Sequence, residues 1–129
     1  MRVELVSPEQ VLFEGDADMV VCRTLGGGDV AFLTGHAAFL GALAIWPVRV
    51  ISTSGEVAFA CHGGFVQVDG KKVVILCDVA ELIDQIEVPR AQAALARADA
   101  ALAANPDDAQ AQAAKLRAEV RIMVAGVRV

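Results

Sequence analysis

The feature that most restricts the fold of this chain is a change in residue usage after about residue 87. Up to about Asp78, short runs of β-branched and other apolar residues alternate with glycine-containing turns, which is typical of β-strands. From Arg90 to Ala118, 14 of 29 residues are alanine and none is glycine, which is typical of α-helices. The sequence therefore predicts an α+β, mainly β fold, with a β unit at residues 1–84 and a helical unit at residues 85–129.

The first half contains a series of strand-length runs. They read RVELV, MVVCR, VRVIS, VAFACH, FVQVD and KKVVILC. Asp69-Gly70 and Ser54-Gly55 stand between pairs of these runs, and such dipeptides favour the tight turns of β-hairpins, Asp-Gly with positive φ at both central residues. Many short strands separated by regular turns predict a sandwich or a barrel.

Two helices are expected in the second half. Pro89 fits the first turn of a helix, where its missing N–H group costs little. The sequence ANPDDA then interrupts the helical pattern, because Pro106 disfavours helical geometry at the residue before it, and Asp107 or Asp108 can cap the helix that follows. The prediction is an antiparallel helical hairpin, joined to the β unit by a hinge at residues 83–88.

Each predicted helix has one apolar stripe, and both stripes are rich in alanine. The first consists of Ala91, Ala94, Leu95, Ala98 and Leu102, and the second of Ala113, Leu116, Val120 and Met123. Methyl side chains bury little area, and burial stabilises by only about 25 cal/mol per Å². We therefore expect the hairpin to dock marginally and to be able to leave its resting place.

Composition excludes two classes of function. The net charge is −5 at pH 7 and no run of lysine or arginine exceeds two residues, so the clustered cations that bind nucleic acid are missing. Although 56% of residues are hydrophobic, the longest uncharged run, 30–48, contains glycine, histidine and proline and does not suit a membrane span. Glu4 and Glu9 interrupt any signal-peptide core, so we expect a cytoplasmic protein. Its excess apolar surface points to a compact core or a protein partner.

Two groups of residues resemble binding motifs but lack their spacing. Gly26-Gly27-Gly28 is followed by no Lys-Ser/Thr pair, and a dinucleotide motif would need glycine at Ala31, so we interpret it as a tight turn that faces a partner. Acidic residues also gather at the junction of the two units, where we expect a solvated linker: Asp78, Glu81, Asp84 and Glu87.

The cysteines and histidines match no known site pattern. Cys22, Cys61 and Cys77 lie among apolar residues without CxxC spacing, so we expect reduced thiols in the core. His36 and His62 have no ligand or nucleophile spacing, and we expect neither a metal site nor catalytic residues. An enzyme built on His36, Cys61 and His62 is one alternative. A free-standing β-sandwich that binds a small molecule under a helical lid is another.

An ordered set of motifs resembles a known family. VELVSPEQVLFEG opens the chain, GDVAFLTGHAAFLGAL follows, and HGGFVQV, VVILCDVAELIDQIE and the alanine-rich hairpin come in that order. Together they resemble the epsilon subunit of F-type ATP synthases over nearly the whole chain. The resemblance implies a β-sandwich of about ten strands that binds the gamma shaft and the c-ring of a proton-translocating synthase. It also implies a rotor subunit without its own active site or resident cofactor, peripheral to the cytoplasmic face of the cell membrane and not inserted.

The resemblance implies a regulatory role for the hairpin. In the family it lies folded on the sandwich, or extends along the shaft into the catalytic alpha/beta head and blocks ATP hydrolysis. Some bacterial members bind ATP through Ile/Leu-Asp-x-x-Arg-Ala, and IEVPRA keeps the last two residues here, so Glu87, Arg90 and Ala91 are candidates for regulatory ATP binding. Cations that would meet acidic surfaces of the head are Lys115, Arg117, Arg121 and Arg128.

Three further positions match residues that the family places near the c-ring. They are Ser7, Asp29 and His36. An exposed ion pair there contributes only about 0 to 1 kcal/mol, so affinity should come from apolar contact. Two residues depart from the family pattern, Ala31 where glycine is usual and Thr34 where proline is usual. Loss of the proline frees φ and restores a backbone donor, so we expect a less rigid loop.

Overall fold

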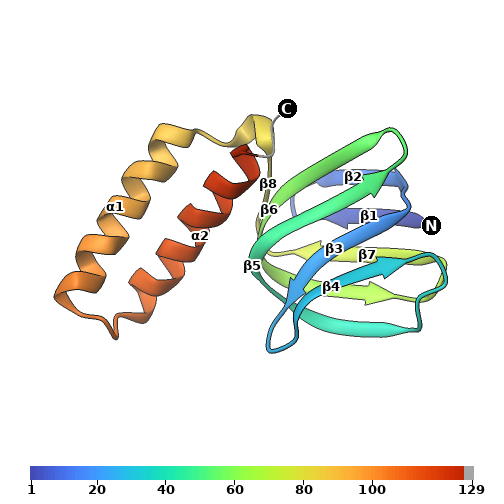
Figure 1. Cartoon of the computed structure of the whole chain (residues 1–129), viewed down its shortest axis with the longest axis horizontal. Coiled ribbons are helices and arrows are strands. Elements are labelled where there is room, and N and C mark those ends of the chain that lie inside the picture. The colour runs from blue at the N-terminus through green and yellow to red at the C-terminus, as the bar shows by residue number, and fades with distance from the viewer. Residues whose placement is uncertain (127–129) are drawn as a thin grey trace.

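The chain folds into a layered β part and a separate pair of helices. In the computed structural model, which describes residues 1–126, the strands gather on one side and the helices on the other (Figure 1). The strands are β1 (Arg2–Val6), β2 (Val11–Asp16), β3 (Met19–Thr24), β4 (Gly28–Leu33), β5 (Phe39–Ser52), β6 (Gly55–Val68), β7 (Lys72–Cys77) and β8 (Ala80–Leu82). The 3₁₀ turn η1 (Ile83–Gln85) leads to α1 (Val88–Ala104) and α2 (Ala109–Gly126). The predicted mainly β class with a C-terminal helical hairpin is confirmed.

Strands β5 and β6 are longer than the short strands expected. Each has 14 residues, and the two pair antiparallel from Phe39 opposite Val68 to Ser52 opposite Gly55. VAFACH and FVQV are therefore parts of one strand, and VRVIS is the end of another. For this reason residues 1–126 contain eight strands where about ten were expected.

Local irregularities let these two strands continue. Gly63 and Gly64 have φ angles of +89° and +137°, so β6 bends between the segment that pairs with β8 and the segment that pairs with β7. The pairing of β5 with β3 shifts register between Arg49, which lies opposite Val21, and Leu43, which lies opposite Thr24. Pro47 lies in this stretch of β5. Its missing N–H group is therefore tolerated inside a strand.

The strand order is β2-β1-β7-β6-β5-β3-β4, with β8 paired to β6. Only β1 and β7 are parallel neighbours among the described strands. The long strands β5 and β6 run through both layers. One layer contains β2, β1, β7 and the halves of β5 and β6 next to β7. The other layer contains β4, β3, β8 and the other halves of β5 and β6. Phe13 of β2 and Phe59 of β6 meet edge to face in the core, with ring centroids 6.2 Å apart.

The cysteines lie in this core, as expected. Cys22, Cys61 and Cys77 are buried and free, and the Sγ atoms of the last two lie 3.0 Å apart. Burial raises the pKa of Cys22 to about 12. The thiols therefore act as apolar packing groups.

The turn between β6 and β7 differs from the expected form. Its central residues are Gly70 and Lys71 rather than Asp69 and Gly70, and only Gly70 has a positive φ, of +93°. Asp69 precedes the turn instead, and its Oδ1 accepts hydrogen bonds from the backbone N–H groups of Lys71 and Lys72 at 3.2 and 2.9 Å. An aspartate side chain that caps the turn in this way removes the need for two residues with positive φ.

The helical hairpin follows its sequence signals. Pro89 lies in the first turn of α1, and the helix ends at Ala104 before the expected break. Asp108 caps α2, because its Oδ1 accepts a hydrogen bond from the Ala111 N–H group at 3.0 Å. The interruption at Pro106 thus separates two antiparallel helices.

The apolar stripe predicted for the second helix is partly wrong. Val120 is fully buried, but Leu116 and Met123 are 46% and 37% exposed. Two separate faces of α2 are covered instead, because the helix lies between α1 and the β layers (Figure 1). The buried residues of α2 are Ala111, Ala118, Val120 and Val124. The stripe on α1 fits better, since Ala91 and Ala98 are buried and the other three are half-buried.

Candidate functional site

Helix α2 docks on the outer face of β5 and β6 through a small apolar contact. Val120 and Val124 pack with Ala58 and Ala60 of β6 and with Ile86 of the connecting segment. Partly buried residues pack around these five: Ile45, Ile83, Val88 and Ala125. All five residues are at least 92% buried. Short side chains on the strand let the helix approach closely, but they limit the area buried.

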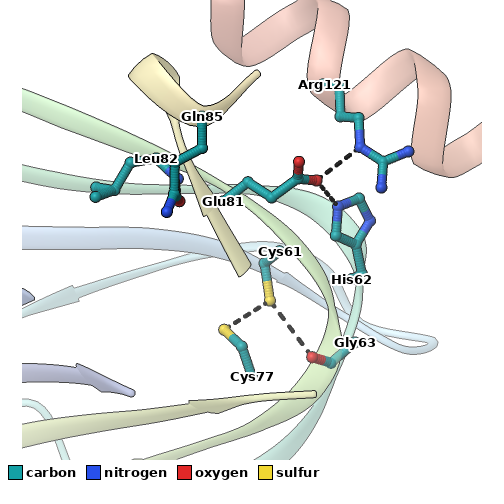
Figure 2. Close-up of polar contacts among 8 residues, drawn as sticks. All are labelled: Cys61, His62, Gly63, Cys77, Glu81, Leu82, Gln85 and Arg121. Carbon is teal, nitrogen blue, oxygen red and sulfur yellow. Dashed lines mark hydrogen bonds and ion pairs between the residues drawn. The ribbon is translucent and has the colours of Figure 1, made fainter. Parts of the chain in front are cut away.

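A polar group of three residues adjoins this contact, which we call the latch: His62, Glu81 and Arg121. Figure 2 shows Glu81 of β8 between the other two. Its Oε1 accepts hydrogen bonds from His62 Nε2 at 2.8 Å and from Arg121 Nε at 2.6 Å. The latch therefore connects β6, β8 and α2. Glu81, expected in a solvated linker, is instead a half-buried link between the two units.

The environment of the latch favours neutral His62 and ionised Glu81. Burial lowers the pKa of His62, and the neighbouring Arg121 charge lowers it further, against the opposing hydrogen bond with Glu81. Burial raises the pKa of Glu81, but the hydrogen bonds from Arg121 and His62 outweigh it, so the net shift is downward. His62 Nδ1 is buried and has no hydrogen-bond partner within residues 1–126.

A cavity of about 410 Å³ lies where the connecting segment meets the two helices. Its lining includes Glu87, Arg90 and Ala91, so the structure brings the three candidates for regulatory ATP binding to one place. The other lining residues are Glu81, Gln85, Ala94, Arg97 and Arg121. Three guanidinium groups outnumber the two carboxylates of this lining, and guanidinium groups suit an anion with several oxygen atoms, such as a phosphate chain.

A second cavity, of about 520 Å³, follows the groove between α1 and α2. Arg97 and Arg121 line this cavity as well as the first one, and Arg117 lines this cavity. Of the cations proposed to reach the catalytic head, Arg117 and Arg121 thus lie in this groove. Lys115 instead pairs with Asp99 of α1, with an N–O distance of 2.9 Å. Arg128 lies outside the described residues.

The outer face of the first β layer carries a row of apolar residues, which we call the apolar strip. Successive cross-strand partners form it: Ala42, Phe65, Leu76, Val6 and Val11, on β5, β6, β7, β1 and β2. Phe65, Leu76 and Val11 are 55%, 48% and 60% exposed. Leu40, also on β5, is 72% exposed. A continuous exposed apolar row of this kind is typical of a protein interface.

The three residues expected near the c-ring do not form one cluster. Asp29 is at the start of β4, and His36 follows the other end of the same strand. Ser7 follows β1 and closes the turn to β2, where its N–H donates to the Gln10 carbonyl at 2.9 Å. The His36 ring packs edge to face against Phe32, with centroids 4.9 Å apart.

Asp29 already has a partner within the chain. Its carboxylate accepts a hydrogen bond from Arg23 Nε at 2.9 Å, and this bond lowers the pKa of Asp29. The Arg23 guanidinium also lies over the Trp46 ring, 3.3 Å from the centroid. Any external cation would compete with this arrangement.

The two departures from the family pattern have different settings. Ala31 lies in the regular ladder of β4, opposite Val21. Thr34 is in the following loop, and its Oγ1 accepts a hydrogen bond from the N-terminal amino group at 3.4 Å. The next residue, Gly35, has φ of +87° and donates its N–H to the Gly70 carbonyl at 2.9 Å. The loop therefore has its own anchors despite the missing proline.

Sequence patterns missed most of the latch and part of the cavity. His62 and Glu81 are 19 residues apart, and Arg121 is 40 residues beyond Glu81. Their spacing matches no motif, and only the fold brings them together. Arg97 gave a weak signal, since it lies two helical turns after Arg90 and reaches the same cavity.

The alternative sites find less support. Cys61 lies in the core, His62 faces α2, and His36 is in the loop before β5. Within residues 1–126, no group of three or more histidine, cysteine or acidic side chains could hold a metal ion. In that same part of the chain, no helix has the length and apolarity needed to cross a bilayer.

Comparison with known proteins identifies the class. The model of the family described as "ATP synthase, Delta/Epsilon chain, beta-sandwich domain" matches residues 1–83. The chain therefore belongs to the ATP synthase delta/epsilon chain family.

The relatives narrow this class to the ATP synthase epsilon chains. The ATP synthase epsilon chain of Streptomyces griseus is 40% identical over 129 residues, which cover 99% of this chain and 97% of the relative. That of Thermobifida fusca is 41% identical over 123 residues, covering 92% and 88%. The epsilon chain of Brevibacillus brevis is 45% identical over 101 residues, covering 77% and 75%.

Solved structures share the fold. A chain of the Euglena gracilis mitochondrial ATP synthase, in a structure of its OSCP, F1 and c-ring parts, superposes with a TM-score of 0.71 at 21% identity, covering 96% of this chain and 76% of that one. A chain from the central stalk and c-ring of the Tetrahymena thermophila mitochondrial ATP synthase gives a TM-score of 0.56 at 21% identity, covering 67% and 68%.

Proposed function

We propose that this epsilon subunit links the gamma shaft to the c-ring of a proton-translocating F-type ATP synthase and restrains ATP hydrolysis through its hairpin. In this proposal residues 1–84 form the coupling unit and residues 85–129 the regulatory unit, and the chain has no active site of its own. It works at the cytoplasmic face of the cell membrane without entering the bilayer. The observation that carries the coupling role is the apolar strip, on a chain whose relatives are epsilon chains.

The gamma shaft is the occupant that we assign to the apolar strip. The strip lies on the layer that does not carry α2, so a partner can cover it while the hairpin stays docked. Ser7 lies beside this layer, directly after β1, whereas Asp29 and His36 border the other strands. We propose that these three residues contact the polar loops of the c-ring from different edges of the sandwich.

Recovery of gamma with tagged epsilon variants tests the coupling role. An aromatic side chain has an area of about 200 Å², and about half of the Phe65 side chain would be covered by gamma, which contributes about 2.5 kcal/mol to binding. Phe65→Asp should therefore weaken gamma binding by at least about 60-fold. Leu33→Asp is the matched control, because Leu33 is also 55% exposed but lies on β4 of the other layer. Unchanged gamma recovery with Phe65→Asp, or equal loss with Leu33→Asp, would contradict the assignment.

The hairpin is the proposed regulator of hydrolysis. Its contact with the sandwich consists of one small apolar cluster and the latch, which suits a unit that leaves and returns. Once extended, Lys115, Arg117 and Arg121 would be free to meet acidic surfaces of the catalytic alpha/beta head. Truncation after Glu87 in the assembled synthase should therefore raise ATP hydrolysis. Unchanged hydrolysis would leave the coupling role alone.

We further propose that ATP binds the cavity beside α1 and holds the hairpin folded. Arg90 and Arg97 would contact the phosphates, and Glu87 and Ala91 would border the nucleotide. Calorimetric titration of the full-length chain with ATP tests this, with Arg90→Ala expected to reduce affinity at least tenfold. Arg49→Ala is the control, since Arg49 pairs with Glu56 on the sandwich. No heat of binding to the unmodified chain would remove this part of the proposal.

The alternative of a small-molecule module with a helical lid has one supporting observation. The two cavities lie at the hairpin, where a lid would close, and not inside the sandwich. Family membership and the apolar strip favour the rotor role. Failure of the chain to assemble with gamma would return the question to these cavities.

A further inference from the structure

His62 is enclosed by the docked hairpin. It follows Ala58 and Ala60 at two-residue intervals on β6, so its side chain lies on the face that α2 covers. Only 4% of the side chain is exposed, and Arg121 of α2 reaches the carboxylate that His62 contacts. Departure of α2 would return this imidazole to water.

The docked site accommodates a neutral imidazole better than a charged one. An ionised carboxylate only accepts hydrogen bonds, so His62 Nε2 carries the hydrogen that is donated to Glu81. Nδ1 then carries a lone pair without a partner in the described part of the chain, which is a modest cost. Protonation would place an N–H donor and a positive charge at this buried position, facing no acceptor among the described residues and under the influence of the Arg121 charge.

We propose that His62 makes docking of the hairpin proton-dependent, so that protonation of its imidazole releases α2 from the sandwich. The proposal rests on the mobility of the hairpin assigned above, but it does not depend on what the released hairpin inhibits.

The charged groups around His62 define the pH range. Glu81 faces it from β8, and Arg121 and Arg117 act on it from α2. The pKa of His62 is lower in the docked state than its usual value of 6.5, so docking is strongest above pH 6.5 and weakens as pH falls below it. Because one proton is involved, the docking constant can fall by at most tenfold for each unit by which the pH falls. Glu81 adds to acid release only below its usual pKa of 4.5, because its own pKa is also lowered.

The latch and the cavity share Arg121 and Glu81. An anion in the cavity and a proton on His62 therefore act on the same contact. Arg121 drawn toward an anion would leave Glu81 to His62 alone, so the docked state would tolerate protonated His62 better and acid release would weaken, in line with the proposal that ATP holds the hairpin folded.

The experiment measures docking in the full-length chain as a function of pH. Spin or fluorescent labels on cysteines introduced at exposed positions Thr53 and Gln112 report the distance from the sandwich to α2, while the native thiols are buried. We expect the docking constant to fall by up to tenfold per unit between pH 6.5 and pH 5. In His62→Gln the same constant should stay level over this range, and in His36→Gln it should follow the unmodified protein.

Direct titration of the imidazole provides the second measurement, which does not require a folded His62 variant. The chain has two histidines, so their NMR signals are assigned with His36→Gln. We expect His62 to titrate below pH 6.5, and its midpoint to rise when Val124→Lys forces the hairpin off the sandwich.

Three results would overturn the proposal. A docking constant that is level from pH 8 to pH 5 would show no proton dependence. A His62 midpoint unaffected by Val124→Lys would show that the hairpin does not control its protonation. A hairpin that remains docked at every pH, even with Val124→Lys, would refute the mobility of the hairpin. Release of the hairpin without pH dependence would leave that mobility standing and refute only the role of His62.

Discussion

The docking contact of α2 allows a quantitative prediction for Val124→Ala. Val124 is fully buried against β6, and the substitution removes two buried methyl groups. At about 0.8 kcal/mol for each, with a further penalty for the cavity left behind, docking should weaken by about 2 kcal/mol. Since 1.4 kcal/mol corresponds to a factor of ten, the docking constant should fall about 30-fold.

The same labelled full-length chain serves as the assay, with Met123→Ala as the matched control. Met123 is the adjacent residue of α2 and is 37% exposed, so its truncation should change docking by less than about 0.5 kcal/mol. The free energy of unfolding of the sandwich should be nearly unchanged in both variants, because Val124 packs on an outer face. Equal effects of the two substitutions on docking would refute the argument that this valine contact holds the hairpin.

In the assembled synthase the weakened docking has a consequence for activity. A hairpin that is undocked more often should extend more often, so Val124→Ala should lower ATP hydrolysis relative to Met123→Ala. Higher hydrolysis with Val124→Ala would show that the released hairpin does not inhibit.

Three further predictions concern the sandwich. At pH 8 the three native thiols should not react with a disulfide reagent, because all three are buried, and burial also raises the pKa of Cys22 to about 12. All three should react in urea, and fast reaction of the native protein would contradict a closed core. The NMR titration midpoint of Asp29 should lie below the usual pKa of 3.8, because the hydrogen bond from Arg23 lowers this pKa. In Arg23→Gln the midpoint should return toward 3.8. Equal midpoints in the two proteins would show that Arg23 is not the cause of the shift. Gly64→Ala should reduce the free energy of unfolding in urea by about 3 kcal/mol or more, because φ is +137° and a Cβ atom would lie 1.9 Å from a carbonyl oxygen of β7. Gly26→Ala is the control and should cost only about 1 kcal/mol, because φ is +78° and the space around it is open. Similar losses in the two variants would refute the steric argument.

Local signals account for the parts of the fold that sequence predicted well. The helical hairpin follows from alanine content, from Pro89 at the start of α1 and from Asp108 as the cap of α2, all of which act within a few residues. The number of strands was harder to predict. Gly63 and Pro47 look like strand breakers, yet both lie inside long strands where the pairing shifts, and pairing partners are distant in sequence.

The candidate sites divide in the same way. The motif around Arg90 was visible in the sequence, and the structure places its residues in one cavity. Which side of α2 is buried could not be predicted from the helix alone, because Leu116 and Met123 are as apolar as Val120 and Val124. The position of α1 and β6 on either side of α2 decides which of them is covered.

By itself, the sequence determined the order of a β half and a helical half, the break between the two helices and the family, since each depends on neighbouring residues or on motif order. Only the tertiary structure decided that β6, β8 and α2 meet at His62, Glu81 and Arg121. The burial of His62, and the lack of a partner for its Nδ1 among residues 1–126, arise from that meeting. The electrostatic environment of a side chain depends on everything packed around it, and for these three residues the neighbours come from segments far apart in the chain.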